Sequence, residues 1–104
     1  MLGRPKTAEE YVDLVDQALF EIEDLRMAAE YDMDSMGAAM DFLEELERDV
    51  RRLRDSMADG SYMFGKENLP FFKLAEHQDE RILPFRQLLL KINETHINGL
   101  DATG

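Results

Sequence analysis

Two long stretches of the sequence carry apolar side chains at alternating spacings of four and three residues, which is the pattern of a helix with one buried face. In the first stretch these positions are Tyr11, Val15, Ala18, Ile22, Leu25 and Ala29, and in the second they are Met36, Ala39, Leu43, Leu46, Val50, Leu53 and Met57. No segment shows the two-residue alternation that is typical of a half-buried strand. The sequence therefore predicts an all-α fold.

The ends of these two helices are marked by residues that favour helix starts and stops. Thr7 and Glu10 have the spacing of a capping box, in which side chains satisfy free backbone N–H groups of the first turn. The aspartates and serine of segment 32–35 interrupt the pattern, and Gly60 can close the second helix in a left-handed conformation. We expect helices over about 7–31 and 34–59. Because the link is short, they should form a long antiparallel hairpin.

The rest of the chain predicts a broken third helix over 69–98. Pro70 fits a first helical turn, where a missing N–H costs nothing. Pro84 should interrupt the helix, because it lacks a donor and its ring crowds the preceding turn. We expect a short helix over 70–80 and a longer one over 83–97, which completes a three- to four-helix bundle.

The chain of 104 residues is the length of one domain, 1–104, and we expect flexible ends over 1–6 and 100–104. The sequence contains no cysteine, which excludes disulfides and thiolate metal sites. No run of roughly 18 apolar residues is present, so we expect no membrane span. No apolar stretch follows the N-terminal residues as it would in a secretion signal, and we expect a cytoplasmic protein.

The net charge of −11 is concentrated in the first helix, since residues 8–34 hold ten acidic side chains and one basic one, Arg26. This charge disfavours binding to nucleic acid or to an anionic membrane. The segment Gly3-Arg4-Pro5 resembles the core of a minor-groove-binding hook, but one short copy does not offset the charge. The end of the second helix is basic, and in a hairpin it should lie against the acidic start of the first.

Few side chains in the sequence are suited to catalysis or metal binding. The two histidines, His77 and His96, lack a glutamate three residues before them, so the Glu-x-x-His motif of di-metal helical bundles is absent. His96 extends the apolar face of the last helix, which favours a partly buried structural histidine at the helix end. No nucleophile–base arrangement or phosphate-binding loop is present. We therefore expect no metal or other cofactor and no enzymatic activity.

Two of the predicted helices carry a second apolar stripe. At 100° per residue, these side chains point away from the buried faces of the first and last helices. They are Phe20, Met27, Leu83, Leu90 and Ile97. Either the third element is threaded between two apolar surfaces, or a second chain covers the stripes. We expect the second arrangement, a homodimer with two-fold symmetry built on these residues.

The loop between the hairpin and the third helix provides a second candidate surface. Together with the first turn of that helix, it holds the aromatic side chains Tyr62, Phe64, Phe71 and Phe72. Some of them should plug the open end of the hairpin, but tyrosine and phenylalanine are also enriched in the cores of protein interfaces. We therefore regard the four residues as a candidate surface for another protein.

Four segments of the sequence resemble a group of short acidic bacterial proteins of unknown function. These segments are GRPKTAEEYV, QALFEIEDLRMAAEYD, DGSYMFGKENLPF and INETHINGLD, which together span most of the chain. Some members are described as general secretion pathway proteins, although the secretion protein of that name lies in the inner membrane. The resemblance implies no active-site residue.

These features together favour a non-enzymatic, self-associating interaction or adaptor module. An alternative hypothesis is a small helical metal-binding protein or enzyme, in which His96 or His77 acts with carboxylates on neighbouring helix turns.

Overall fold

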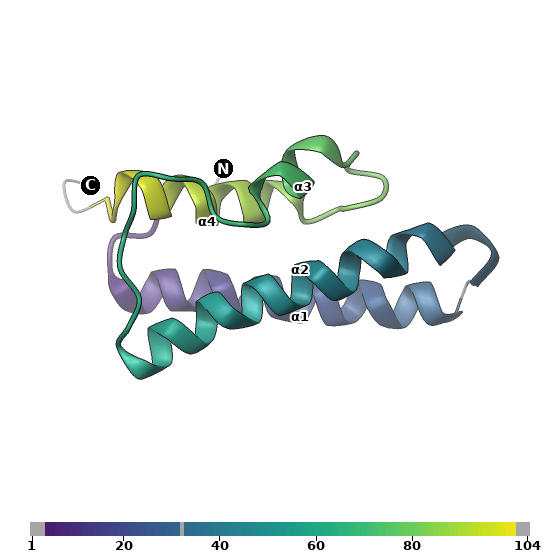
Figure 1. Cartoon of the computed structure of the whole chain (residues 1–104), viewed down its shortest axis with the longest axis horizontal. Coiled ribbons are helices and arrows are strands. Elements are labelled where there is room, and N and C mark those ends of the chain that lie inside the picture. The colour runs from purple at the N-terminus through teal and green to yellow at the C-terminus, as the bar shows by residue number, and fades with distance from the viewer. Residues whose placement is uncertain (1–3, 32, 102–104) are drawn as a thin grey trace.

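The computed structural model describes residues 4–31 and 33–101, and the side chains of 4–30 and 42–101. This part of the chain contains four helices and no strand (Figure 1), which confirms the all-α prediction. The helices are α1 (Ala8–Tyr31), α2 (Met33–Asp59), α3 (Phe72–His77) and α4 (Arg86–Asn98).

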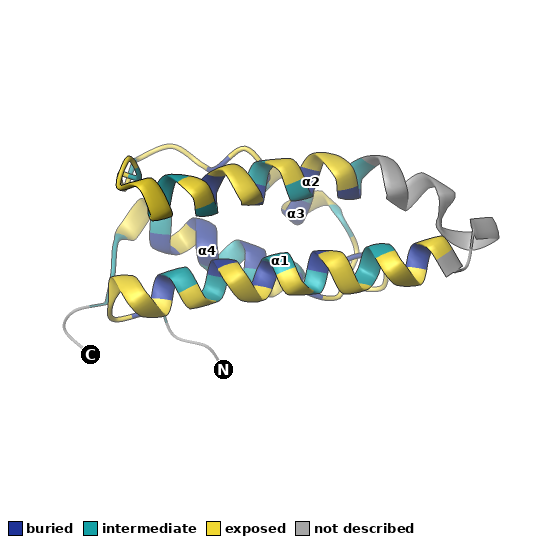
Figure 2. Cartoon of the chain, turned by 90° about the horizontal axis from the view of Figure 1, so that it is seen from below, coloured by how far each residue is buried: buried dark blue, intermediate teal, exposed yellow. Residues whose placement is uncertain are grey.

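The helices form two layers. α1 and α2 pack side by side as the expected antiparallel hairpin, and α4 packs on α1 with α3 beside it. Figure 2, which views the hairpin from outside, shows α3 and α4 behind it. Buried side chains therefore line the inner faces of both layers.

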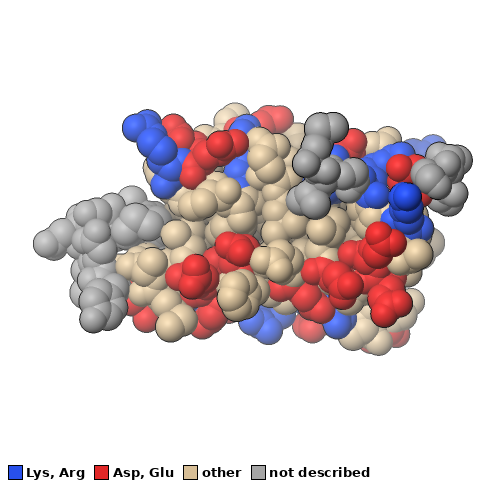
Figure 3. Space-filling model, turned by 180° about the vertical axis from the view of Figure 1, so that it is seen from behind, with Lys and Arg blue, Asp and Glu red and all other residues tan. Residues whose placement is uncertain are grey.

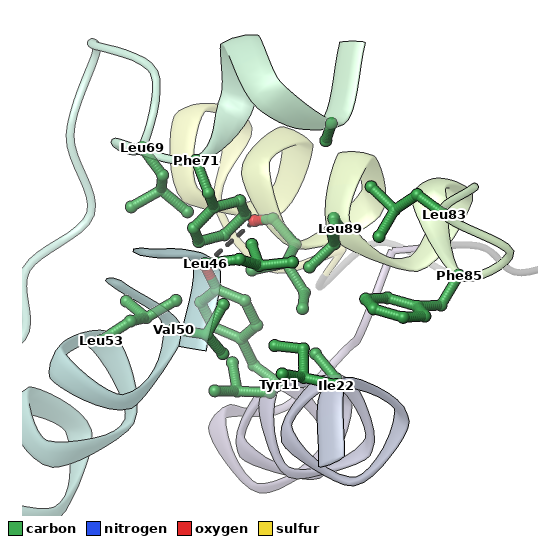
Figure 4. Close-up of a cluster of buried hydrophobic side chains, with 14 residues drawn as sticks. Tyr11, Ile22, Leu46, Val50, Leu53, Leu69, Phe71, Leu83, Phe85 and Leu89 are labelled. Atoms are coloured by element: carbon green, nitrogen blue, oxygen red, sulfur yellow. Dashed lines mark hydrogen bonds between the residues drawn. The ribbon is translucent and has the colours of Figure 1, made fainter. Parts of the chain in front are cut away.

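The core follows the predicted helix faces closely (Figure 4). The side chains that fill it come from α1, α2 and the segment from Leu69 to α4: Tyr11, Val15, Ala18, Ile22, Leu46, Val50, Leu53, Leu69, Phe71, Ala75, Leu83, Phe85, Leu89 and Ile92. Met36 and Ala39 of the predicted second face lie outside the described side chains. Wherever both helices are described, the spacing of apolar residues identified the buried face.

The helix boundaries agree with the predicted caps to within a few residues. The Glu10 amide donates to Oγ1 of Thr7 over 3.1 Å and starts α1, and Gly60 follows α2 with φ of 81°. α2 begins at Met33, one residue earlier than expected, and Asp32 lies outside the described residues.

The third helix is broken as predicted, but both pieces are shorter. α3 covers only Phe72–His77, and α4 begins at Arg86 rather than at residue 83. The residue before a proline is driven out of the helical region, which removes Leu83 from α4. The Leu83 amide instead donates to the Asp79 carbonyl over 2.8 Å and closes a turn.

Four residues that were assigned to surfaces belong to the core or pack against it, namely Leu83, Phe71, Leu90 and Tyr62, which corrects their assignment to a free surface. Leu83 is fully buried, Phe71 is 1% exposed, and Leu90 is half-buried against the core cluster. The segment from Leu69 to α4 therefore packs on the hairpin. This packing covers Leu83 and part of Leu90, which the sequence had placed on the second apolar stripe. This was the alternative that the sequence left open for the stripes.

The described parts of the two chain ends are in contact with each other and with the core. The Asp101 amide donates to the Pro5 carbonyl over 2.8 Å, and Leu100 packs against the core. Residues 1–3 and 102–104 lie outside the described residues. The flexibility of the chain ends stays a prediction, since these contacts describe where Pro5, Leu100 and Asp101 lie and not how they move.

The charges of the hairpin match in part as expected. Asp16 of α1 accepts from Nε of Arg54 of α2 over 2.7 Å, and Arg26 pairs with Glu47 across the same helices. Exposed pairs of this kind contribute ~0–1 kcal/mol each. No helix in the described part of the chain is long and apolar enough to cross a membrane.

Candidate functional site

Two surfaces stand out, and the first lies at the open end of the hairpin. We call it the aromatic end and define it as Tyr11, Tyr62, Phe64, Gly65 and His96. The segment after α2 runs from the hairpin to the second layer and passes the end of α4 on its way to α3 (Figure 1). This path brings residues from α1, the loop and α4 together.

The rings of the aromatic end are in direct contact. Tyr11 and Phe64 are stacked, with centroids 5.8 Å apart and an interplanar angle of 8°. Tyr62 meets both rings edge-on at centroid distances of 5.7 and 5.3 Å, and the His96 ring lies 5.6 Å from Tyr62. Edge-to-face and offset pairs are favourable geometries for aromatic rings, so the loop is held on α1 by more than apolar burial.

A chain of three hydrogen bonds links these side chains. The Tyr11 hydroxyl donates to the Ile92 carbonyl over 3.1 Å, and its oxygen lies 3.1 Å from the Tyr62 hydroxyl. The Tyr62 hydroxyl in turn lies 2.7 Å from Nδ1 of His96. A carbonyl can only accept a hydrogen bond, so the Tyr11 hydroxyl donates its proton to the Ile92 carbonyl. The bond between the two tyrosines then requires the Tyr62 hydroxyl to donate to the Tyr11 oxygen. All three bonds are made only when His96 carries a proton on Nδ1 and donates it to Tyr62.

The environment of the three hydrogen-bonded side chains, Tyr11, Tyr62 and His96, favours their uncharged forms near neutral pH. Burial raises the pKa of Tyr11 far above its ordinary value, and the hydrogen bond with Tyr62 raises it further. Burial also raises the pKa of Tyr62, and it lowers the pKa of His96. A raised pKa makes a tyrosine a poor nucleophile or base. The hydrogen bonds of Tyr62 to Tyr11 and His96 join the loop to α1 and α4.

Gly65 allows the loop to approach α4 closely. Its amide donates to the His96 carbonyl over 3.2 Å. A Cβ at this position would lie 2.9 Å from Nε2 of His96, closer than real Cβ contacts. Only glycine fits here without a shift of the His96 ring.

An apolar groove of about 270 Å³ opens beside these rings. Its lining residues come from the start of α1, the end of α2 and the loop: Ala8, Tyr11, Val12, Met57, Gly60, Tyr62 and Phe64. Phe64, one of the lining residues, is 46% exposed, and Met63, which lies between the lining residues Tyr62 and Phe64 in sequence, is 81% exposed. An exposed apolar side chain is thus the sequence neighbour of two residues that line the groove.

The four loop aromatics predicted as a partner surface have different positions. Tyr62 and Phe64 line the groove, Phe72 is half-buried at the start of α3, and Phe71 is in the core. Leu69 precedes Phe71, and its amide donates to Oδ1 of the buried Asn93 over 2.7 Å. This bond fixes the segment so that Phe71 points inward.

Two residues that hold the loop in place, Tyr11 and Asn93, were not predicted for this role from the sequence. Tyr11 was predicted only as a core position, although a buried tyrosine needs a partner for its hydroxyl. Asn93 was assigned no role, yet it is 4% exposed and its Nδ2 donates to Oδ1 of Asn68 over 2.9 Å. An asparagine between the apolar Ile92 and the buried Thr95 was the available signal.

The second surface is the outward face of α1. We define it by the exposed apolar residues Phe20 and Met27 and by the exposed acids around them: Glu9, Asp13, Asp16, Glu23 and Asp24. Phe20 is 65% exposed and Met27 is 61% exposed. Figure 3 shows a band of acidic side chains along α1, with uncharged ones between them.

The remaining candidates lie apart from both surfaces. Ile97 of α4 is 36% exposed, but Phe20 and Met27 point away from the side of α1 that packs on α2 and α4. Ile97 therefore does not continue their stripe. His77 is exposed in α3, and the described residues contain no group of three or more His, Cys, Asp or Glu that could hold a metal ion.

Comparisons with known proteins give no relative to reason from: no family model, curated protein or solved structure matches the chain. The resemblance to short acidic bacterial proteins stays a prediction.

Proposed function

We propose that the chain is a non-enzymatic protein-interaction module that self-associates through its aromatic end. The observation that carries the proposal is the apolar groove, whose lining residues Tyr62 and Phe64 flank the exposed Met63 in sequence. A two-fold dimer uses the same patch on both copies, so the patch needs a part that protrudes and a part that receives. Met63 of one copy can enter the groove of the other, and the reverse contact follows by symmetry.

The chemistry of the groove suits this contact. Its walls are apolar side chains and rings held by the hydrogen-bond chain, so little order is lost on binding. Methionine is flexible and polarizable and packs favourably against aromatic rings. Burying one such side chain contributes roughly 1.5–3 kcal/mol. Association entropy opposes this gain, so we expect a weak dimer.

The sequence predicted a homodimer built on the second apolar stripes, and we now propose the dimer contact at the aromatic end instead. Leu83 is buried, and Leu90 is half-buried in the same chain. Phe20 and Met27 remain exposed, but acidic side chains surround them. Two copies meeting on that face would bring like charges together.

The proposal is tested by light scattering across a range of protein concentrations. We expect the wild type to approach the mass of a dimer at high concentration and Met63→Glu to remain a monomer, because a carboxylate cannot enter an apolar groove unpaired. Phe20→Glu is the matched control, since it adds the same charge at another exposed apolar position. A monomeric wild type would refute self-association, and a dimer lost only in Phe20→Glu would move it to α1.

The alternative of a metal-binding protein or enzyme has less support. Nδ1 of His96 is engaged with Tyr62, and His77 is exposed on another helix. Metal analysis of protein purified without a histidine tag separates the two hypotheses. A stoichiometric bound metal would favour the alternative.

A further inference from the structure

The outward face of α1 has features that neither the fold nor the proposed dimer uses. Phe20 and Met27 are seven residues apart, which places them roughly 10.5 Å apart along the helix axis and on one line. Both point away from the core and keep most of their surface in water. Single exposed apolar residues are ordinary, but two on one line form a stripe that another helix can cover.

The charge around this stripe is acidic on both sides. Asp16 is paired with Arg54, and Glu23 lies 3.8 Å from Arg26. Within the described part of the chain, no basic side chain pairs with Asp13 or Asp24, and both are exposed. The stripe is thus bordered by carboxylates that are available to an incoming positive charge.

We propose that the outward face of α1 is a docking surface for a basic amphipathic helix of a partner protein. Apolar side chains of that helix cover Phe20 and Met27, and its lysines or arginines lie against the flanking carboxylates. An amphipathic helix docks through apolar anchors at spacings of three, four and seven residues, and Phe20 and Met27 have the seven-residue spacing. The partner is recognised by this chemistry, so its binding is expected to be steered by charge and weakened by salt.

A second copy of the chain is a poor occupant of the same face. It carries the same acids and a net charge of −11, so face-to-face contact places carboxylates against carboxylates. Like charges in an interface oppose association and suppress wrong partners. Charge complementarity therefore selects a basic occupant.

The test uses two synthetic peptides of about 18 residues, which as helices span roughly 27 Å. The first has leucines on one helical face and lysines elsewhere. The second has the same composition in scrambled order, so that its leucines point in all directions. Calorimetric titration of the intact protein is carried out in ~50 mM and ~300 mM salt, and circular dichroism verifies that each variant is folded.

We expect the amphipathic peptide to bind at least roughly tenfold more tightly than the scrambled one. Replacing both Phe20 and Met27 by alanine should remove that preference. Ile82→Ala, a change at an exposed apolar residue in the turn before α4, should retain it. Met63→Glu should also retain it, which separates this surface from the proposed dimer contact.

Two results would overturn the inference. Equal binding of the two peptides would mean attraction by charge alone, without a docking stripe. Loss of a wild-type dimer in Phe20→Glu would mean that a second copy covers the face. The first result leaves the proposed dimer unaffected, whereas the second also moves the self-association from the aromatic end to α1.

Discussion

The aromatic end and the outward face of α1 are both candidate binding surfaces, yet they are built in opposite ways. The aromatic end joins three segments, with Tyr11 in α1, Tyr62 in the loop and His96 in α4. The outward face lies on one helix and includes Phe20, which is 65% exposed. A surface made by tertiary contacts also holds the fold together, whereas a surface on the far side of one helix contributes little to it. Substitutions in the aromatic end should therefore lower the free energy of unfolding, and substitutions on the outward face of α1 should affect binding alone.

The largest expected difference is between Tyr11→Ala and Phe20→Ala. Tyr11 is 2% exposed and touches both Tyr62 and Phe64, so its truncation should cost about 3–5 kcal/mol of unfolding free energy. Phe20→Ala should stay within about 0.5 kcal/mol of the wild type. Urea unfolding followed by circular dichroism measures both values. Similar losses in the two variants would remove the distinction between the surfaces.

A smaller effect is expected where the loop meets α4. Gly65→Ala would place a Cβ 2.9 Å from Nε2 of His96, whose ring is held by Tyr62. Crowding of this kind typically costs ~1–3 kcal/mol. Lys66→Ala, next along the chain and exposed, is the matched control. If thermal melting showed Gly65→Ala to be as stable as the control, the His96 ring would be free to move aside.

The smallest effect is a pH dependence confined to the aromatic end. Burial lowers the pKa of His96 in the folded state, so the unfolded chain binds the proton more readily. Stability should therefore fall as the pH drops below the unfolded value of about 6.5, and it should be recovered above that value. The change is small because the ring is only partly buried.

Melting temperatures at about pH 7.5 and about pH 5.5 test this expectation on either side of that value. His96→Gln should reduce the difference between the two conditions, whereas His77→Gln, at the exposed histidine of α3, should leave it unchanged. An equal pH response in the wild type and His96→Gln would assign the dependence to other groups.

Local chemistry was enough to predict most of the helical framework. The spacing of apolar residues gave the buried faces of α1 and α2, and the capping pair Thr7 and Glu10 gave the start of α1. Pro84 gave the break before α4, because its ring and missing N–H act on adjacent residues. The outward face of α1 follows from the same periodicity, since Phe20 and Met27 lie opposite the buried positions.

Only the tertiary structure decided what covers each apolar side chain. Periodicity marks a face as apolar but does not state whether a second chain or a later segment of the same chain will lie on it. Leu83 was therefore assigned to a dimer interface, although α3 and the turn after it bring it into the core. The loop has no period at all, and its path is set by contacts between residues far apart in sequence, such as Tyr62 with His96 and Leu69 with Asn93. The groove exists because those distant contacts are made together.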